Sequence, residues 1–333
     1  MRAFVLDGYG AVADHVRLAE IADPVPGPDD VLIEIHAASL NPIDFKIVHG
    51  NLKRVSKYQL PRPFGFDASG VVLSAGVRAV RFKAGDAVYV RASRERIGTF
   101  AEKIALPQEF VALKPASVSH AEAAALPLVG LTTLQGFARV KASAGQRILI
   151  HAGAGGIGTF AVQYARHLGL HVTTTTSSKN ADFVKSLGAD RVIAYDRENY
   201  LEAGGDYDIV YDTLGGAFTT DAFKVVKRGG AVISLSGPPD RDFARREGAG
   251  WLVRAAVWLM SRKVYAASAE AGAIYCWFFT EPSGDQLREI AELVDRGAIK
   301  PVIDRDFPFE QLPAALGHLE TGRARGKVVL RVR

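Results

Sequence analysis

The sequence predicts an α/β protein with two domains: an irregular β-barrel of short strands and a doubly wound parallel sheet. Its 333 residues are enough for two domains of ordinary size. Short alternating strand patterns, broken by Pro and Gly, fill residues 1–118. Beyond residue 119 strand and helix patterns alternate, which is typical of a parallel sheet covered by helices on both faces.

The individual elements follow from periodicity and helix-capping residues. Alternating polar and apolar residues predict strands at 29–40, 70–77 and 85–92. Either Ser117 or Ser119 could cap a helix that runs through Ala125. The remaining patterns predict helices at 130–140, 156–169, 179–189 and 283–298, and strands at 146–152, 171–177, 191–195, 207–213, 230–237, 274–279 and 326–332.

Composition narrows the class of protein. A net charge of +5 is too mild for a nucleic-acid footprint. The single Cys276 excludes an intramolecular disulfide and any multi-cysteine zinc cluster, which fits a reducing compartment. The N-terminus has no signal-peptide pattern, and the longest apolar stretch, at 250–260, is too short to span a bilayer. We therefore expect a soluble, cytoplasmic protein without an integral membrane segment.

The segment 241–268 is basic and amphipathic, and two interpretations remain open. Its tryptophans, aliphatic residues and arginines could form a helix that lies on a membrane surface. We favour a helix that caps the substrate cleft or forms a subunit interface, with its large apolar residues lining a pocket for a hydrophobic substrate.

A glycine-rich loop follows the strand predicted at 146–152. Gly153, Gly155 and Gly158 match G-x-G-x-x-G, and a helix pattern follows directly. Such glycines allow a tight turn and the close approach of a pyrophosphate, which the helix N-terminus attracts. A glycine-rich turn without a ligand is the alternative. The strand–loop–helix context favours dinucleotide binding, with Gly156 and Ile157 in the same loop.

The end of the next strand indicates which dinucleotide binds. An NAD site usually places an acidic residue there to hold the ribose hydroxyls. This chain instead has Thr176, Ser177, Ser178 and Lys179, with no acid before Asp182. Hydroxyls and an ammonium group suit a 2′-phosphate, so the sequence predicts NADP(H). An ordinary polar loop, with a serine as helix cap, is the alternative.

The whole chain resembles the medium-chain dehydrogenase/reductase superfamily, and within it the zinc-free quinone oxidoreductase-like branch. The resemblance is carried by matching segments at 41–46, 64–72, 82–90, 123–137, 153–158, 185–190 and 322–330. It implies a GroES-like catalytic domain made of residues 1–118 and 281–333, with a Rossmann domain at 119–280 inserted between them. The resemblance also implies a homodimer, paired through the strand at 274–279.

The resemblance also bears on metal binding. Zinc alcohol dehydrogenases of this superfamily have a Cys where this chain has Asn41, and His-Glu where it has Phe66 and Asp67. Neither Asn nor Phe replaces thiolate or imidazole as a zinc ligand. We therefore expect a metal-free enzyme that acts on substrates already activated for hydride acceptance.

Candidate site residues come from matches to the same family. Asn41 is expected beside the nicotinamide, although an Asn before Pro42 also shapes turns. Thr132 resembles a threonine near the carboxamide, with back-bonding inside a helix as the alternative. Tyr58 could donate to a substrate oxygen. Three further residues match positions that contact the cofactor: Lys46, Tyr195 and Lys327. The alternatives are support of the loop for Lys46, packing at a buried edge for Tyr195, and a solvated charge at a strand edge for Lys327.

The sequence thus predicts NADPH-dependent hydride transfer to a quinone or to the C=C bond of an α,β-unsaturated carbonyl compound. The partner is then a small hydrophobic carbonyl or quinone substrate. An enoyl-thioester reductase is one alternative, left open by Arg241, Arg245 and Arg246. A non-catalytic NADPH-binding redox sensor or assembly factor is an alternative of another class.

Overall fold

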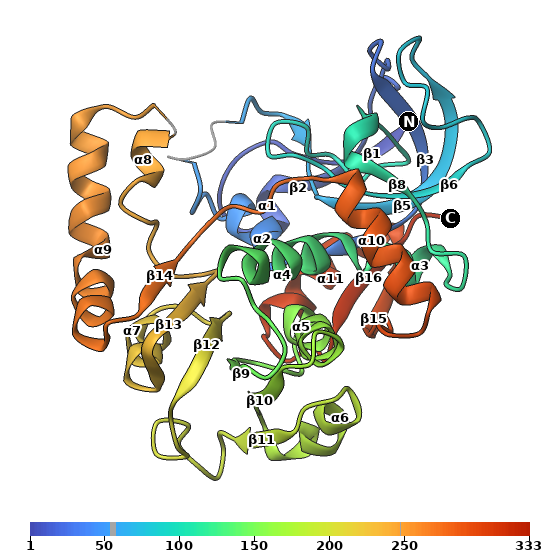
Figure 1. Ribbon diagram of the computed structural model, residues 1–333. Helices are drawn as coiled ribbons and strands as arrows, with labels where there is room; N and C mark the ends of the chain where they lie inside the picture. Colours follow the sequence, from blue (N-terminus) through green and yellow to red (C-terminus); the bar gives the residue numbers. More distant parts are fainter. Residues whose placement is uncertain (54–57, 247) are drawn as a thin grey trace. The chain divides into compact units, whose positions relative to one another are not determined.

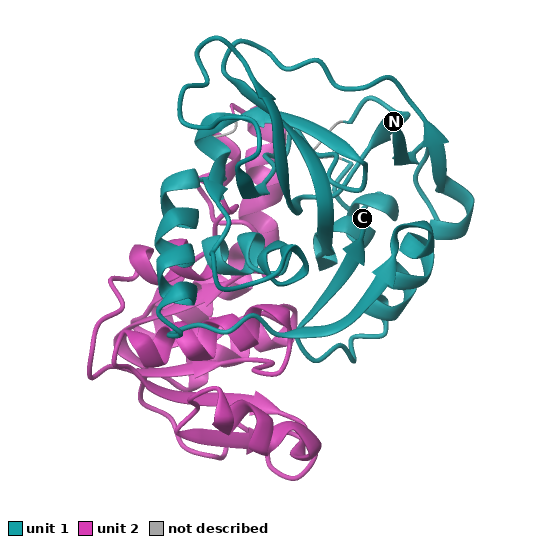
Figure 2. Ribbon diagram, turned by 90° about the vertical axis from the view of Figure 1, so that its right-hand side faces the viewer, with its two compact units in different colours: residues 1–132, 281–333 teal, residues 133–280 magenta. Residues whose placement is uncertain are grey.

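The chain divides into two compact units in the computed structural model, which describes residues 1–53, 58–246 and 248–333. Unit 1 comprises residues 1–132 and 281–333, and unit 2 comprises residues 133–280 (Figure 2). The boundary predicted after residue 118 thus lies before the one observed. Residues 119–132 group with unit 1 because helix α3 (His120–Ala124) packs against strands β3 (Asp30–Leu40), β5 (Asp67–Ala75) and β16 (Lys327–Arg331) of that unit.

Unit 1 contains two sheets (Figure 1). The larger has the order β15-β16-β3-β5-β6-β8, with β7 also paired to β3, and it is antiparallel except between β15 and β16. The smaller has the order β2-β1-β4. The elements not yet placed are β1 (Arg2–Leu6), α1 (Val12–His15), β2 (Val16–Glu20), α2 (Pro42–Val48), β4 (Arg62–Pro63), β6 (Ala87–Arg91), β7 (Lys103–Pro107), β8 (Val111–Leu113), α10 (Gly284–Asp295), β15 (Ile303–Pro308) and α11 (Leu312–Glu320).

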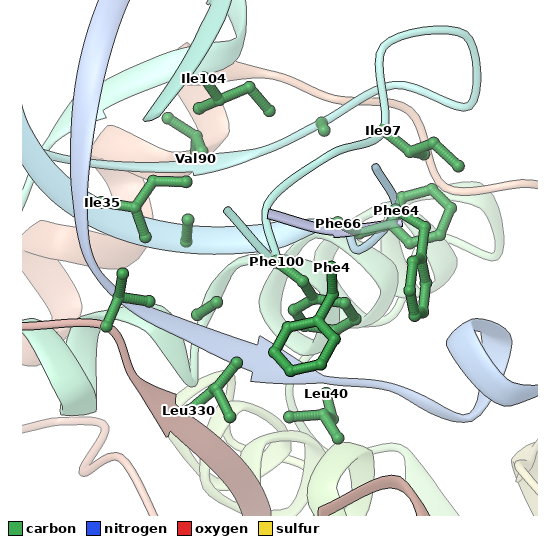
Figure 3. Close-up of a cluster of buried hydrophobic side chains, with 14 of the residues drawn as sticks. Phe4, Ile35, Leu40, Phe64, Phe66, Val90, Ile97, Phe100, Ile104 and Leu330 are labelled. Carbon is green, nitrogen blue, oxygen red and sulfur yellow. The ribbon is translucent and has the colours of Figure 1, made fainter. Parts of the chain in front are cut away.

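Large apolar side chains from distant parts of the sequence fill the core of unit 1. Phe64 and Phe100 pack edge to face, as do Phe4 and Phe309, and Leu330 of β16 belongs to the same cluster (Figure 3). Each such side chain, when fully buried, stabilises the fold by about 1.5–3 kcal/mol. The core therefore depends on both ends of the chain.

Unit 2 is built on a six-stranded parallel sheet with the order β11-β10-β9-β12-β13-β14. This order is that of a doubly wound nucleotide-binding sheet, so the predicted fold class is confirmed. Helix α4 (Pro127–Arg139) crosses from unit 1 into unit 2. The other elements are β9 (Arg147–Ile150), α5 (Gly156–His167), β10 (His171–Thr176), α6 (Ala181–Ser186), β11 (Arg191–Ala194), β12 (Tyr207–Asp212), α7 (Ala217–Asp221), β13 (Val226–Ser234), α8 (Phe243–Arg246), α9 (Trp251–Ala271) and β14 (Ile274–Cys276).

The structure decides between two predicted helix caps and shortens one predicted strand. Ser119 caps α3 by accepting a hydrogen bond from the backbone N–H of Glu122, whereas Ser117 donates to Asp295 instead. The strand predicted at 274–279 ends at Cys276 because Trp277 and Phe279 turn to pack edge-on against Phe243. Periodicity alone could not separate a short strand from an aromatic cluster.

The basic segment 241–268 forms α8 and most of α9, and its residue 247 lies outside the described residues. Only Val257, Ser261 and Val264 of α9 are buried. In the part of the chain that the structure describes, no helix combines the length and the hydropathy needed to cross a bilayer.

Candidate functional site

Asn41 lies in a buried polar cluster that joins separate elements of unit 1. Its carbonyl oxygen Oδ1 accepts a hydrogen bond of 2.5 Å from Nζ of Lys327. Its amide Nδ2 donates to Oδ2 of Asp67 at 3.0 Å. A lysine ammonium can only donate and a carboxylate only accepts, so the two neighbours fix which way the Asn41 amide points.

Asp67 ties the same cluster to helix α4. Its Oδ1 accepts from the backbone N–H of Leu128, in the first turn of α4, at 3.1 Å. Its Oδ2 lies 3.5 Å from Nζ of Lys327. Burial raises the pKa of Asp67 and lowers that of Lys327, and the attraction between the two charges opposes both shifts. One cation and one anion therefore face each other beside the Asn41 amide.

Asp44 supplies a second carboxyl group to the cluster. Its Oδ2 accepts from the backbone N–H of Asn41 at 2.7 Å, and its Oδ1 has no hydrogen-bond partner among the described residues. Burial, with a smaller contribution from the nearby Asp67, raises the pKa of Asp44 to about 8. This carboxyl group is thus mainly protonated near pH 7, which leaves the Lys327–Asp67 pair balanced.

Phe66 is fully buried in the core, at the position where zinc relatives carry a histidine. The guanidinium of Arg91 lies over its ring, with Cζ 5.4 Å from the ring centre. Among the described residues, no three His, Cys, Asp or Glu side chains are grouped so that they could hold a metal ion.

Unit 1 also contains three other candidates: Lys46, Tyr58 and Thr132. Lys46, on α2, is partly buried, and this burial lowers the pKa of its ammonium group. Tyr58 packs against the core and lies beneath the guanidinium of Arg62, 5.1 Å from Cζ to the ring centre. The loop residues 54–57 just before it lie outside the described residues. Thr132 is buried inside α4.

In unit 2 the glycine loop connects β9 to α5, as predicted. A Cβ on Gly153 would lie 2.1 Å from Oγ1 of Thr174, and one on Gly158 would lie 2.2 Å from the carbonyl oxygen of Ala152. Gly155 has an ordinary φ of −79°, and its Cβ would meet only the Ala152 oxygen at 3.3 Å. Packing within the protein thus requires Gly153 and Gly158, whereas it explains Gly155 poorly.

The start of α5 fits an anionic ligand. No side chain caps this 12-residue helix at Gly155, and its first turn holds no acidic residue. Its first N–H groups therefore remain available for a pyrophosphate, and Gly155, Gly156 and Ile157 lie at the partly exposed surface of the loop. The residues present fit a dinucleotide.

A buried network of hydrogen bonds supports the glycine loop between β9 and α5. His151 begins the loop, and its Nδ1 lies 3.4 Å from Oδ1 of Asp212 at the end of β12. Asp212 also accepts from the hydroxyls of Thr219 and Ser234, and these bonds, together with that to His151, lower its pKa to about 2 despite its burial. The network fixes the carboxyl ends of adjacent strands, where α/β sheets bind their ligands.

The residues predicted to hold a 2′-phosphate come together at the ends of β10 and β11. The backbone N–H of Tyr195 donates to the carbonyl of Thr176 at 3.0 Å. Tyr195 is 67% exposed, which excludes the edge-packing alternative. Ser177 follows Thr176 directly, and the side chain of Lys179 is exposed, with no ionic partner among the described residues.

Sequence reasoning missed an acid at this site. The carboxylate of Asp196 accepts from the backbone N–H of Ser178 at 2.8 Å and from its hydroxyl at 2.6 Å. These bonds lower the pKa of Asp196, so it carries a negative charge. The acid lies after the following strand and not at the end of β10, where the sequence was searched. The pairing of β10 with β11 brings the two strand ends together, and this pairing is the signal that could have found it.

Comparison with known proteins places this arrangement in a family. Residues 27–116 match the family described as "Alcohol dehydrogenase GroES-like domain", and residues 187–330 match "Zinc-binding dehydrogenase". The chain therefore belongs to the medium-chain dehydrogenase/reductase superfamily, a group of oxidoreductases.

Particular relatives cover nearly the whole chain. The chain is 34% identical to the bovine (Bos taurus) protein "NAD(P)H oxidoreductase RTN4IP1, mitochondrial", over 100% of this chain and 89% of the relative. It is 34% identical to "NADPH-dependent alkenal/one oxidoreductase, chloroplastic" of Arabidopsis thaliana, over 99% and 79%. The quinone oxidoreductase structure from Coxiella burnetii matches with a TM-score of 0.86 at 30% identity, covering 100% of this chain and 99% of that one.

Proposed function

We propose that this protein transfers hydride from NADPH to quinones or to the β-carbon of α,β-unsaturated carbonyl compounds, without a metal ion. The observation that carries this proposal is the Lys327–Asn41–Asp67 cluster. It presents an oriented amide where zinc relatives carry their first metal ligand. Relatives named as NADPH-dependent alkenal/one oxidoreductase and as quinone oxidoreductase support the substrate class.

Asn41 can replace the electrostatic role of a metal. Its Oδ1 is held by Lys327, and one Nδ2–H is held by Asp67, which leaves the second Nδ2–H without a partner among the described residues. Hydride addition to an enone or quinone creates negative charge on oxygen. A fixed N–H donor stabilises that charge as an oxyanion hole does. A proton from water then completes the saturated carbonyl compound or the hydroquinone.

The glycine loop and the ends of β10 and β11 would hold the cofactor. When bound, NADPH supplies the hydride. Gly155 and the first turn of α5 would hold the pyrophosphate. Lys179 and Tyr195 would contact the 2′-phosphate. A cofactor contact by Lys46, whose ammonium group has no carboxylate partner among the described residues, stays a prediction from the family resemblance. The negative charge of Asp196 would repel a phosphate bound at Ser178. A preference for NADPH over NADH would therefore depend mainly on the positive charge of Lys179.

A homodimer also belongs to this proposal. Strand β14 forms one edge of the unit 2 sheet, and its Ile274 is exposed. An exposed edge strand is a template for pairing with a second copy. The cytoplasmic location stays a prediction.

The test is the oxidation of NADPH by the purified protein, with an aromatic ortho-quinone and a short alkenal as acceptors. The loss of the near-ultraviolet absorbance of NADPH measures the rate. We expect turnover with at least one acceptor. Asn41→Ala should lower kcat by about tenfold to a hundredfold, because one oxyanion donor is lost. NADPH affinity, measured by fluorescence, should stay nearly unchanged.

The exposed Asn51→Ala serves as the matched control and should retain full turnover. NADPH binding without turnover of either acceptor would overturn the proposal. It would favour the enoyl-thioester reductase, which crotonyl-CoA would reveal, or the non-catalytic sensor.

A further inference from the structure

Helix α9 carries large apolar side chains that are exposed to solvent. Trp251 is 74% exposed and Met260 is 63% exposed, although both residue types are usually much more buried. The other exposed members of this surface are Leu252, Val253, Trp258 and Leu259. All six lie within the first three turns of one helix, so they form a single contiguous apolar surface, which we name the α9 face.

The packing of α9 against unit 2 does not require the apolar residues of the α9 face. Val257, Ser261 and Val264 are the buried residues of α9, and their spacing of four and three marks the side that contacts unit 2. Leu252, Ala255 and Leu259 follow the same kind of spacing, rotated to the far side of the helix. The helix thus has two apolar sides, and the fold of unit 2 uses only one of them.

Basic residues surround the α9 face. Arg254, Arg262 and Lys263 are exposed on α9, and none has a carboxylate partner among the described residues. Arg241 lies next to Trp258, with its Cζ 5.7 Å from the ring centre and 4.1 Å from that of Tyr265. The only acidic residue of α9 is Glu270, in its last turn. On α9 itself, the charge near the exposed tryptophans is therefore positive, and Asp242 beside Arg241 is paired with Arg245.

We propose that α9 docks this protein on a membrane surface rich in anionic lipid. Tryptophan and aliphatic side chains insert at the boundary of headgroups and acyl chains, and arginine and lysine pair with lipid phosphates. α9 would lie in the plane of the interface and not cross it, in agreement with its hydropathy.

The charge argues against a second copy of this chain as the occupant. Two α9 faces packed together would bring Arg254, Arg262 and Lys263 of both copies into one contact with few carboxylates to balance them. An anionic lipid surface meets the same residues with the opposite charge.

The test is co-sedimentation of the purified full-length protein with vesicles of phosphatidylcholine alone or with phosphatidylserine added, at low and at physiological salt. We expect binding to the anionic vesicles, weakened by salt, and little binding to phosphatidylcholine alone. The double variant Leu252→Ser/Leu259→Ser should lose about tenfold or more in binding, and Arg262→Glu/Lys263→Glu should lose at least as much.

A matched control removes exposed apolar residues elsewhere: Val25→Ser/Val77→Ser should bind vesicles as the unaltered protein does. Both of these valines are almost fully exposed in unit 1. Because the measurement needs neither cofactor nor acceptor, its result is independent of the proposed function. The charge-reversal variant changes only exposed side chains, so the test remains decisive even if the serine variant folds poorly.

Two outcomes would overturn the proposal. One is the absence of binding to anionic vesicles at low salt. The other is an oligomer, seen by light scattering, that Leu252→Ser/Leu259→Ser dissociates, because the α9 face would then be covered by a second copy.

Discussion

At the residue scale, Asp196 changes the electrostatics of the predicted 2′-phosphate site. Its carboxylate occupies both donors of Ser178, the residue that the sequence pattern offers to the phosphate. The exposed ammonium of Lys179 lies next in the chain. In the proposed site, cofactor preference would therefore depend on the balance between the cation of Lys179 and the anion of Asp196, which Arg197 partly offsets, and not on the absence of an acid.

Variants of these two residues should shift that balance in opposite directions. We expect Lys179→Ala to lower the preference for NADPH over NADH by about tenfold, because an attraction to the phosphate is lost. Asp196→Asn should raise it several-fold, since the amide can still accept from Ser178 but carries no charge. The ratio of kcat/KM values for the two cofactors measures both effects. Lys185→Ala, on the same stretch of chain, should leave the ratio unchanged, and an unchanged ratio in Lys179→Ala would contradict the assignment.

Asp44 should make stability depend on pH. Its pKa is 3.8 in the unfolded chain and about 8 in the fold, so the folded state holds the proton more tightly. The stabilisation from this group is fully present below about pH 4 and is lost as pH rises through about 8. We expect Asp44→Asn to flatten the decline of Tm over this window, measured by thermal unfolding. Asp182→Asn, an exposed control, should follow the unaltered protein; parallel curves for Asp44→Asn would refute the burial argument.

At the element scale, the glycines of the loop between β9 and α5 serve two different purposes. Gly153 and Gly158 allow the loop to pack against Thr174 and against its own backbone. Gly155 stands at the partly exposed start of α5, where a Cβ would meet only the carbonyl oxygen of Ala152 at 3.3 Å, and where the pyrophosphate would lie in the proposed site. The motif as a string of letters does not distinguish these uses, but the close contacts do.

Alanine substitutions should separate stability from cofactor binding. Gly153→Ala should lower Tm, because its Cβ would collide with the Thr174 hydroxyl. Gly155→Ala should leave Tm nearly unchanged but weaken NADPH binding by about tenfold or more, measured by fluorescence. Gly317→Ala, in α11 with open space around its Cβ, should affect neither quantity. Equal loss of Tm in both loop variants would show that Gly155 is also needed for packing.

At the scale of the whole molecule, local patterns predicted the elements better than they predicted the contacts between them. The strand–loop–helix order of unit 2 follows from periodicity and glycine placement, and the structure agrees. Lys327 shows the opposite case: the sequence favours a solvated charge at a strand edge over a cofactor contact, but the structure buries this side chain. Its partner Asn41 lies 286 residues away, and no local pattern encodes so distant a pairing.

Asp44 and Asp67 were missed as members of the buried polar cluster around Asn41 for the same reason. Each is a single carboxylate, and single carboxylates are usually structural. Their membership becomes visible only when β16 brings the Lys327 ammonium group to 3.5 Å from Asp67, near the buried Asp44. Likewise, residues 119–132 have helical patterns like those of unit 2, but their contacts place them in unit 1.

The place of Lys327 on β16 also links the site to the local dynamics of unit 1. Strand β16 pairs with β15 and β3, and any opening of these pairs withdraws the ammonium group from the Asn41 carbonyl oxygen and from the Asp67 carboxylate. Hydrogen exchange of the β16 backbone amides would therefore report how often the Asn41 amide loses its orientation.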